Sequence, residues 1–591
     1  MKKLLVRILA TIGAWVVIMA IFGLLSSLMS RQHVPDRVVL ELDLGQGLVE
    51  HLPTGSVAAL MFGQIRTTRD VVDALERAAQ DERVVGLLAR ITPAGLGLAQ
   101  LQEIRDAVRL FRAQGKPALA YADSLGGIGP GNGVYYLATA FDDIYIQPSG
   151  GVGLTGLMFE SVFFQGTLEK LGIEPRFGVR GKYKNAVNLY TERHYTPAHK
   201  EAVQSLMDSQ FGQLVNGIAE SRSLDQDEIR ALMSSGPFLA QDALQAKLVD
   251  GLAYRDEVYQ TMAERTGPEA ERLSLFTYLD RAGRPHTEGD AIALVYGVGI
   301  VQSGKTSFNP VFGGPVMGAD TVASAFRHAI DDTEVRAIVF RVDSQGGSPL
   351  ASDTIWRETL RARQAGKPVI VSMGNVAGSG GYFIAMAADK IVAQPGTITG
   401  SIGVFGGKML TARLSEKIGL SSDEVHTSEN ATMWSSNLDF SPAQWAKFNQ
   451  QLDWIYHDFT TKVAQGRQLD HEHVLSVAEG RVWTGQDAKT HGLVDELGGF
   501  PVALRLAKQA AGIAPEAAVE VRLFPRQRPL SAHLLDRMLG RDSEDAASAS
   551  GQAVRSSLRA LQPLVRLAHD LGLGPDPGVL TMPEWATGVE W

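Results

Sequence analysis

The chain contains two divergent copies of one long unit. The segment GNGVYYLATAFDDIYIQP (131–148) aligns without gaps to GSGGYFIAMAADKIVAQP (378–395), at an offset of 247 residues. Near the end of each copy, AQDALQAKLVDGL matches GQDAKTHGLVDEL at an offset of 245. This period is far too long for a solenoid of short repeats. We therefore expect a duplicated domain, with one copy at 36–285 and the other at 286–525.

Within each copy, short runs of β-branched residues alternate with amphipathic stretches. In the second copy, AIVFRVDS and PVIVSMG are predicted strands, and ASDTIWRETLRARQAG between them is a predicted helix. Such alternation is typical of a parallel sheet covered by helices. Open sheets of this kind place ligands at the carboxyl ends of their strands. The sequence predicts an α/β fold, with its site at strand-to-helix junctions.

The N-terminus has the pattern of a membrane anchor. Lys2, Lys3 and Arg7 precede an uncharged, mostly apolar stretch over 8–30. About 20 such residues cross a bilayer core, whereas the apolar part of a cleaved signal peptide spans only about 7 to 15. We interpret 1–31 as a cytoplasmic stub and an uncleaved transmembrane helix, with the rest of the chain beyond the membrane. A cleaved signal peptide and a buried core helix are the alternatives.

Composition and charge narrow the function classes. The 591 residues are 45% hydrophobic and 20% charged, which is typical of a globular protein of several domains. The absence of cysteine excludes disulfides, thiolate metal sites and a cysteine nucleophile. A net charge of −9, with no basic block beyond the N-terminus, argues against a nucleic-acid partner. Residues 526–591 look like a solvated low-complexity tail, with 556–573 as a possible amphipathic helix for an oligomer or membrane contact.

The most informative single position is Ser379, in the glycine-rich stretch 374–390. Gly378 and Gly380 flank this serine, and the aligned position of the first copy, between two matching glycines, is Asn132. Both copies keep the glycines, but only the second keeps the hydroxyl. Because glycine alone gives a tight turn its freedom, the serine is not needed for the bend. The comparison favours a nucleophile over a small turn residue.

A nucleophilic serine requires a base and donors for the oxyanion. We expect the donors to be the backbone N–H groups of Gly346 and Gly347, which follow a predicted strand, and of Gly380 at a helix start. Neither an H-E-x-x-H nor an S-x-x-K motif is present, and 13 histidines leave a histidine base open. The first copy carries Lys182 and Lys184, whereas the corresponding stretch of the second copy has no lysine. This complementarity indicates one composite site shared by the two copies.

Four motifs resemble the signal peptide peptidase A (protease IV) family, in its long bacterial form with two fused copies. They are YKNAV (183–187), AGSGGY (377–382), TGSIGV (399–404) and WTGQDAKTHGLVDELG (483–498). The resemblance extends from the predicted anchor to about residue 525. It implies a duplicated Clp protease/crotonase-like fold and a Ser/Lys dyad.

The resemblance also implies a role for particular residues. The family nucleophile falls on Ser379, the general base on Lys184, and a serine that hydrogen-bonds the lysine amine on Ser401. Lys182 occupies a position that the family does not fix. The family's oxyanion loop, N-S-P-G-G, reads D-S-Q-G-G at 343–347, so that Asp replaces Asn and Gln replaces Pro.

The activity that the resemblance implies is that of a serine endopeptidase at the periplasmic face of the bacterial inner membrane. It would degrade cleaved signal peptides and other short apolar peptides through an acyl-enzyme, without metal or cofactor, as a homotetramer. The alternatives are a catalytically silent, membrane-anchored scaffold that binds peptides and an acyl-CoA enzyme of the crotonase type. A scaffold has no use for Lys184 and Ser379 together, and a crotonase-type enzyme requires neither an anchor nor a serine nucleophile.

Overall fold

The computed structural model describes residues 33–525, apart from 46, 52–65, 93–94, 128 and 310–313, together with residues 15, 19 and 580–581. Within this described part, no helix is both long and apolar enough to span a bilayer. The anchor predicted at 1–31 lies almost entirely outside the described residues, as does the helix predicted at 556–573.

The first copy forms a six-stranded parallel sheet in the order β8-β4-β3-β2-β1-β9. Its strands are β1 (Val38–Asp43), β2 (Val84–Arg90), β3 (Ala118–Ala122), β4 (Asp143–Ile146), β8 (Gly251–Leu252) and β9 (Glu271–Ser274). One face packs on α3 (Thr68–Gln80), α4 (Leu98–Arg112), α5 (Asn132–Ala138) and α12 (Leu275–Ala282), and the other on α11 (Arg255–Thr266). Helices therefore cover both faces, as the apolar strand sequences require.

The second copy forms an eight-stranded sheet with the main order β20-β18-β16-β14-β10-β22. Its strands are β10 (Asp290–Val298), β14 (Val335–Ser344), β16 (Val369–Gly378), β17 (Lys390–Ala393), β18 (Ile398–Gly400), β20 (Val482–Thr484), β21 (Glu496–Leu497) and β22 (Val519–Phe524). All of its pairs are parallel except β18 with β20. The predicted strands AIVFRVDS and PVIVSMG are β14 and β16, and the helix predicted between them is α14 (Pro349–Gln364).

Two apolar layers enclose this second sheet. Alternate residues of β14 point to opposite faces: Ile338 and Phe340 pack toward α13 (Ala319–Asp331) and α14, and Val339 packs toward α20 (Phe500–Ala510). The short helix α15 (Gly380–Ala385) follows β16 directly and is buried throughout. The strand-to-helix junction predicted to carry the site is therefore held inside the core.

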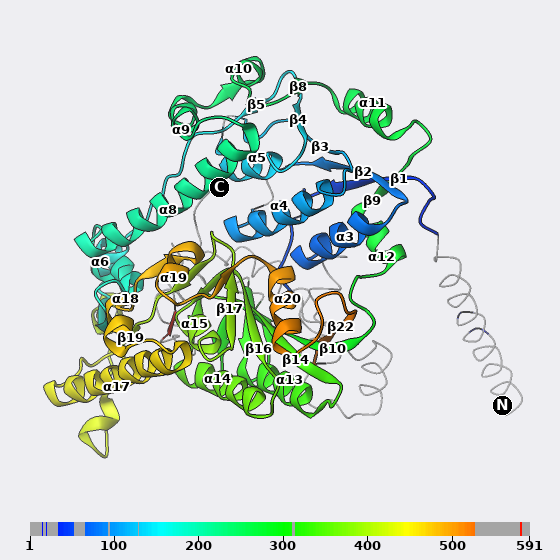
Figure 1. Ribbon diagram of the computed structural model, residues 1–591. Helices are drawn as coiled ribbons and strands as arrows, with labels where there is room; N and C mark the ends of the chain where they lie inside the picture. Colours follow the sequence, from blue (N-terminus) through cyan, green and yellow to red (C-terminus); the bar gives the residue numbers. More distant parts are fainter. Residues whose placement is uncertain are drawn as a thin grey trace, which may run out of the picture.

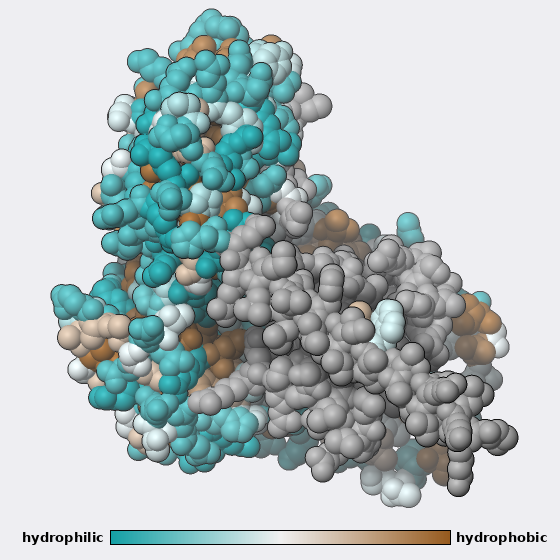
Figure 2. Space-filling view, turned by 90° about the vertical axis from the view of Figure 1, so that its right-hand side faces the viewer, coloured by the Kyte–Doolittle hydropathy of each residue, from teal (hydrophilic) through white to brown (hydrophobic). Residues whose placement is uncertain are grey.

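The two copies interlock through elements that cross between them (Figure 1). Strand β6 (Glu174–Arg180) of the first copy pairs antiparallel with β19 (Val404–Leu410) of the second. Helix α8 (Pro197–Arg222) packs its first half against β20 and its second half on the core of the first copy. Figure 2 shows another side of the molecule, where the described surface is mostly hydrophilic with scattered apolar patches.

The remaining elements are connections and surface segments. The strands among them are β5 (Gly151–Val152), β7 (Phe238–Leu239), β11 (Ile300–Gln302), β12 (Ser307–Asn309), β13 (Gly314–Gly318), β15 (Gly346–Gly347) and β23 (Leu580–Thr581). The helices are α6 (Gln165–Leu171), α7 (Asn188–Thr191), α9 (Gln226–Ser235), α10 (Ala240–Gln245), α16 (Ala412–Lys417), α17 (Pro442–Arg467), α18 (His471–Val477) and α19 (Gly485–Thr490).

Candidate active site

Ser379 occupies a strained turn between β16 and α15. Its backbone has φ 55° and ψ −115°, a conformation that non-glycine residues rarely adopt. Its N–H donates to the carbonyl oxygen of Gly400 at 2.8 Å, and its side chain is fully buried. The neighbouring glycines allow close packing, because a Cβ on Gly381 would lie 2.4 Å from the carbonyl oxygen of Ser344. Such strain is frequent at functional sites.

Lys184 reaches this turn from the other copy. The β6–β19 ribbon pairs Arg180 with Val404, so Lys184 and Ser401 both lie just beyond the same end of the ribbon. The backbone at Lys184 rests against Gly480, where an added Cβ would be 2.6 Å from the Cβ of the lysine. Local sequence did not indicate this role for Gly480.

The three side chains meet in one buried cluster. The Nζ of Lys184 lies 2.8 Å from the Oγ of Ser379, and 2.9 Å from both the Oγ and the carbonyl oxygen of Ser401. Ser379 and Ser401 are fully buried and Lys184 is 1% exposed. Ser401, like Ser379, has a positive φ, of 51°. The structure thus brings together the three residues to which the family resemblance gave the roles of nucleophile, base and orienting serine.

Burial controls the charge of Lys184. Desolvation lowers the pKa of this lysine well below its usual value, with no opposing contribution from a carboxylate. Burial in a low-dielectric site disfavours the ammonium form. The neutral amine can therefore accept a proton from a hydroxyl within hydrogen-bond distance.

Lys182 lies apart from this cluster. Its Nζ forms an ion pair with Glu479 at 3.0 Å, and its side chain is 58% exposed. The hydrogen bond to Glu479 raises the pKa of Lys182. The neighbouring lysine therefore remains charged and does not share the position of Lys184.

The glycine loop after β14 lies beside the start of α15. Ser344 donates its hydroxyl hydrogen to the carbonyl oxygen of Gly299 at 2.6 Å and accepts the N–H of Gly346 at 3.1 Å. An added Cβ on Gly380 would lie 3.0 Å from the backbone nitrogen of Gly347, and one on Gly347 would lie 2.1 Å from a carbonyl oxygen of β11. These close contacts leave no room for a side chain at Gly347 or Gly380. They also place these two predicted donor residues next to one another.

A short piece of the chain pairs with this loop. Strand β23 (Leu580–Thr581) runs antiparallel to β15, with Gly346 opposite Thr581 and Gly347 opposite Leu580. It also lies next to β19. The edge of β15 therefore accepts an extended peptide backbone.

The corresponding region of the first copy lacks the cluster. Asn132, aligned with Ser379, donates its side-chain amide to the carbonyl oxygen of Gly156 and accepts the N–H groups of Thr155 and Gly156. Leu154 occupies the position aligned with Ser401. In the first copy these positions stabilise a loop. Among the residues that the structure describes, no group of three acidic, histidine or cysteine side chains is placed to hold a metal ion.

Comparison with known proteins agrees with this arrangement. The model of peptidase family S49 matches residues 110–268 and 361–514, one segment in each copy. Protease 4 of Salmonella typhi is 33% identical over 497 residues, covering 80% of this chain and 78% of the relative. Protease 4 of Haemophilus influenzae is 33% identical over 471 residues, covering 77% and 74%. The chloroplastic serine protease SPPA of Arabidopsis thaliana is 32% identical over 445 residues, covering 74% of this chain and 64% of the relative.

The chain belongs to peptidase family S49 and is a serine protease. A ClpP1 structure from Listeria monocytogenes covers 36% of this chain and 94% of its own length, with 15% identity and a TM-score of 0.23. The α/β class of this chain rests on the parallel sheets described above.

Proposed function

We propose that the chain is a membrane-anchored endopeptidase that cleaves short apolar peptides, including released signal peptides, with Ser379 as nucleophile and Lys184 as general base. The observation that carries this proposal is the 2.8 Å contact between the Nζ of Lys184 and the Oγ of Ser379 in a fully buried setting. At pH 7 only roughly 1 in 2,500 ordinary lysines is neutral. A useful base needs a pKa nearer to neutrality, and burial shifts the pKa of Lys184 in that direction.

The proposed reaction uses the contacts of Lys184 with Ser379 and Ser401. Lys184 removes the hydroxyl proton of Ser379, whose Oγ attacks the carbonyl carbon of the scissile peptide bond. When the C–N bond breaks, Lys184 returns that proton to the leaving amine, and an acyl-enzyme remains. Lys184 then takes a proton from water, whose oxygen attacks the ester carbon; the bond from that carbon to the Oγ of Ser379 breaks, and Lys184 returns the proton to Oγ. Ser401 keeps the lone pair of the amine directed at Ser379 through its 2.9 Å contact.

Two of the three candidate oxyanion donors suit the site better than the third. The N–H of Gly346 already donates to Ser344. Gly380 is the first residue of α15, where a backbone N–H has no acceptor within the helix. The backbone nitrogen of Gly347 lies close to Gly380. We therefore assign the oxyanion to the N–H groups of Gly347 and Gly380, which favour negative charge beside a helix start.

The pairing of β23 with β15 supports an extended peptide as the substrate. Proteins that bind peptides by strand addition take affinity from backbone hydrogen bonds and specificity from side-chain pockets. A substrate that pairs with Gly346 and Gly347 as Leu580 and Thr581 do would present its backbone to the donors beside Ser379. Folded proteins offer few such free strands, which favours short, unfolded peptides.

The location and assembly are part of the same proposal. The apolar stretch over 8–30 anchors the chain in the inner membrane, with the protease on the periplasmic side, where released signal peptides stay in the bilayer. Four large apolar residues after β19, Ile418, Leu420, Val425 and Trp434, are exposed, which supports self-association, proposed here as a homotetramer. We place the two copies at 36–285 and 286–525, with the boundary in the segment between β9 (Glu271–Ser274) and β10 (Asp290–Val298).

The test is hydrolysis of a fluorogenic apolar peptide by the detergent-solubilised chain, combined with labelling by a fluorophosphonate. We expect Ser379→Ala and Lys184→Met to lose turnover by at least about 10³-fold, and the fluorophosphonate to modify Ser379. Lys182→Met is the matched control and should keep its activity. Turnover by Ser379→Ala would overturn the mechanism, and peptide binding without turnover by the unmodified chain would favour the scaffold.

A further inference from the structure

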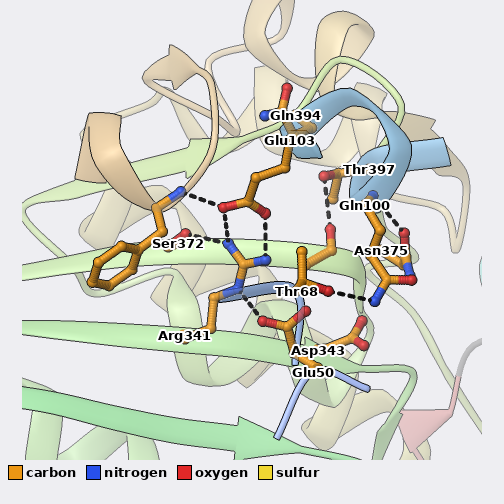
Figure 3. Close-up of polar contacts among 12 residues, drawn as sticks. Glu50, Thr68, Gln100, Glu103, Arg341, Asp343, Ser372, Asn375, Gln394 and Thr397 are labelled. Atoms are coloured by element: carbon orange, nitrogen blue, oxygen red, sulfur yellow. Dashed lines mark hydrogen bonds and ion pairs between the residues drawn. The ribbon is translucent and has the colours of Figure 1, made fainter. Parts of the chain in front are cut away.

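A buried ionic cluster joins the two copies beneath the site. Arg341, on the central strand β14, donates from Nε to Glu50 at 2.6 Å and from its terminal nitrogens to Glu103 at 2.7 Å and to the hydroxyl of Ser372 at 2.8 Å. The side chains of Arg341, Glu50 and Glu103 are only 3–4% exposed. Figure 3 shows the guanidinium held between the two carboxylates. Both glutamates come from the first copy and the arginine from the second.

Helix α4 of the first copy connects this cluster to the second sheet at more than one point. Its Glu103 also accepts the N–H of Phe500 at 2.6 Å, at the start of α20. One turn earlier, Gln100 and Asn375 exchange two hydrogen bonds of 3.1 and 2.7 Å. Asn375 belongs to β16, four residues before Ser379 (Figure 3). The same helix thus contacts both strands whose ends form the candidate site.

Asp343 connects the cluster with those strand ends. It lies two residues after Arg341 on β14, and residues at this spacing face the same side of a sheet. Its Oδ1 accepts the N–H of Val376 at 2.9 Å, and its carbonyl oxygen accepts the N–H of Gly299 at 2.9 Å. Asp343 directly precedes the loop that carries Gly347, and Val376 is three residues before Ser379. One side chain therefore joins the donor loop to the segment of the nucleophile.

Burial disfavours the charged form of the carboxylates beside Arg341. Burial raises the pKa of Glu50 to about 7 and also raises the pKa of Asp343, and the positive charge of Arg341 offsets part of the rise in both. Burying such groups costs more free energy than burying apolar side chains of the same size, unless every partner is satisfied. Ala337 and Val339, which precede Arg341 on the same face of β14, belong to an apolar cluster. The ionic cluster therefore joins the copies at a higher cost in free energy than apolar packing would. What it adds to apolar packing is a fixed geometry.

We propose that the Glu50–Arg341–Glu103 cluster and Asp343 form a positioning network through which the first copy sets the geometry of the donor loop and of the strand end before Ser379. This inference rests on the proposed function, because the geometry matters only if Ser379 is the nucleophile. None of the four residues touches the reacting atoms. They act on the site through β14 and β16, and a displacement of about 1 Å there is enough to slow the reaction about 10²-fold.

The first copy supplies a matched control for the arginine. Arg90 pairs with Tyr121 in β3 as Arg341 pairs with Ser372 in β16, so the two arginines occupy equivalent register positions. Arg90 is 38% exposed and forms ion pairs with Asp123 and Asp43 at the surface. Its removal tests the loss of an arginine from the same strand position without disturbing the interface between the copies.

The experiment measures kcat, KM and the fluorophosphonate labelling rate of full-length variants. We expect Arg341→Met, Glu103→Gln and Asp343→Ala to lower kcat by about 10- to 100-fold, with KM changed by less than about 3-fold. Asp343→Asn keeps an oxygen that can accept the N–H of Val376 and should restore most of the activity lost in Asp343→Ala. Arg90→Met should stay within about 2-fold of the unmodified chain.

Active-site titration separates positioning from misfolding. A positioning role predicts that each molecule still binds one fluorophosphonate, but more slowly. A smaller labelled fraction at the original rate would mean lost fold and would overturn the proposal, as would kcat values equal to those of the unmodified chain. If the unmodified chain itself is not labelled at Ser379, the proposed function fails first, which distinguishes the two failures.

Discussion

Lys184 and Ser379 are 195 residues apart in the chain, and their side-chain atoms Nζ and Oγ lie 2.8 Å apart. They come from different copies of the duplicated unit, and the β6–β19 ribbon brings them together. The consequence is a site that neither copy can form by itself. Five predictions follow from its geometry.

The rate of acylation should rise with pH through the lowered pKa of Lys184. Desolvation lowers this pKa, so the reactive neutral amine becomes abundant well below pH 10.4, the ordinary value. The measurement is the rate of fluorophosphonate labelling between pH 5 and pH 11, with Lys182→Met as a control that should give the same profile. A rise centred near pH 10.4 would contradict the assignment of Lys184.

Lys184→Met should unfold at a higher temperature than the unmodified chain at neutral pH. Unfolded lysine is protonated below about pH 10.4, whereas the folded state favours the neutral amine, so unfolding takes up protons in the interval between the two pKa values. The folded state loses about 1.4 kcal/mol for each unit of pKa depression at pH values below that interval, and this penalty disappears as the pH approaches 10.4. Thermal unfolding at pH 7 and pH 10 should therefore show an advantage for methionine that shrinks with pH. An advantage independent of pH would reflect packing alone.

Removal of the Ser401 hydroxyl should slow the reaction without abolishing it. The carbonyl oxygen of Ser401 still lies 2.9 Å from the Nζ of Lys184 after the hydroxyl is removed. The loss of one hydrogen bond predicts a fall in kcat of about 3- to 10-fold. Because φ at this position is 51°, Ser401→Gly is the cleaner variant and Ser401→Ala adds backbone strain. Equal kcat values for Ser401→Gly and the unmodified chain would remove this residue from the mechanism.

Gly480→Ala should reduce activity strongly because the new methyl group would displace Lys184. Gly480 has φ 77°, and an added Cβ would lie 2.6 Å from the Cβ of the lysine. We expect a fall in kcat of about 10²-fold. Gly366→Ala is a matched control, since Gly366 has φ 76° but no atom within 4 Å of an added Cβ. That control should lose some stability and keep its kcat; if both variants lose activity equally, backbone strain is the cause.

Two prolines in β23 should make the site more accessible to peptides. Leu580 and Thr581 pair with Gly347 and Gly346, where we place the substrate backbone. Proline removes the N–H that a strand donates to its neighbour. The variant carrying both Leu580→Pro and Thr581→Pro should show a lower KM for a fluorogenic peptide and an unchanged kcat. An unchanged KM would mean that β23 does not compete with peptides.

Much of the fold follows from local sequence. The apolar runs of β14 and β16 and the amphipathic pattern of α14 identify these elements because buried parallel strands need apolar residues on both faces. The internal comparison singled out Ser379, because Asn132 takes its place between the same glycines in the other copy. Such signals are readable because they depend on residues that are neighbours in the chain.

Contacts between the two copies could not be predicted from local sequence. The residues alone did not distinguish Lys182 from Lys184 as the base, although a family motif favoured the second. Only packing decides that Lys184 is buried beside Ser379 and that Lys182 pairs with Glu479 at the surface. The pKa of each lysine follows from that environment, not from its neighbours in sequence.

Packing, and not local sequence, also decides the environments of the two arginines Arg90 and Arg341. Arg90 and Arg341 occupy equivalent positions on equivalent strands, and Arg341 lies in the predicted strand AIVFRVDS. One is half-exposed at the surface and the other is buried between Glu50 and Glu103. The sequence by itself determined the duplication, the strands and the candidate nucleophile. The tertiary structure decided which lysine lies beside Ser379 and which arginine is buried between the copies, because these desolvated positions arise where the two copies pack together.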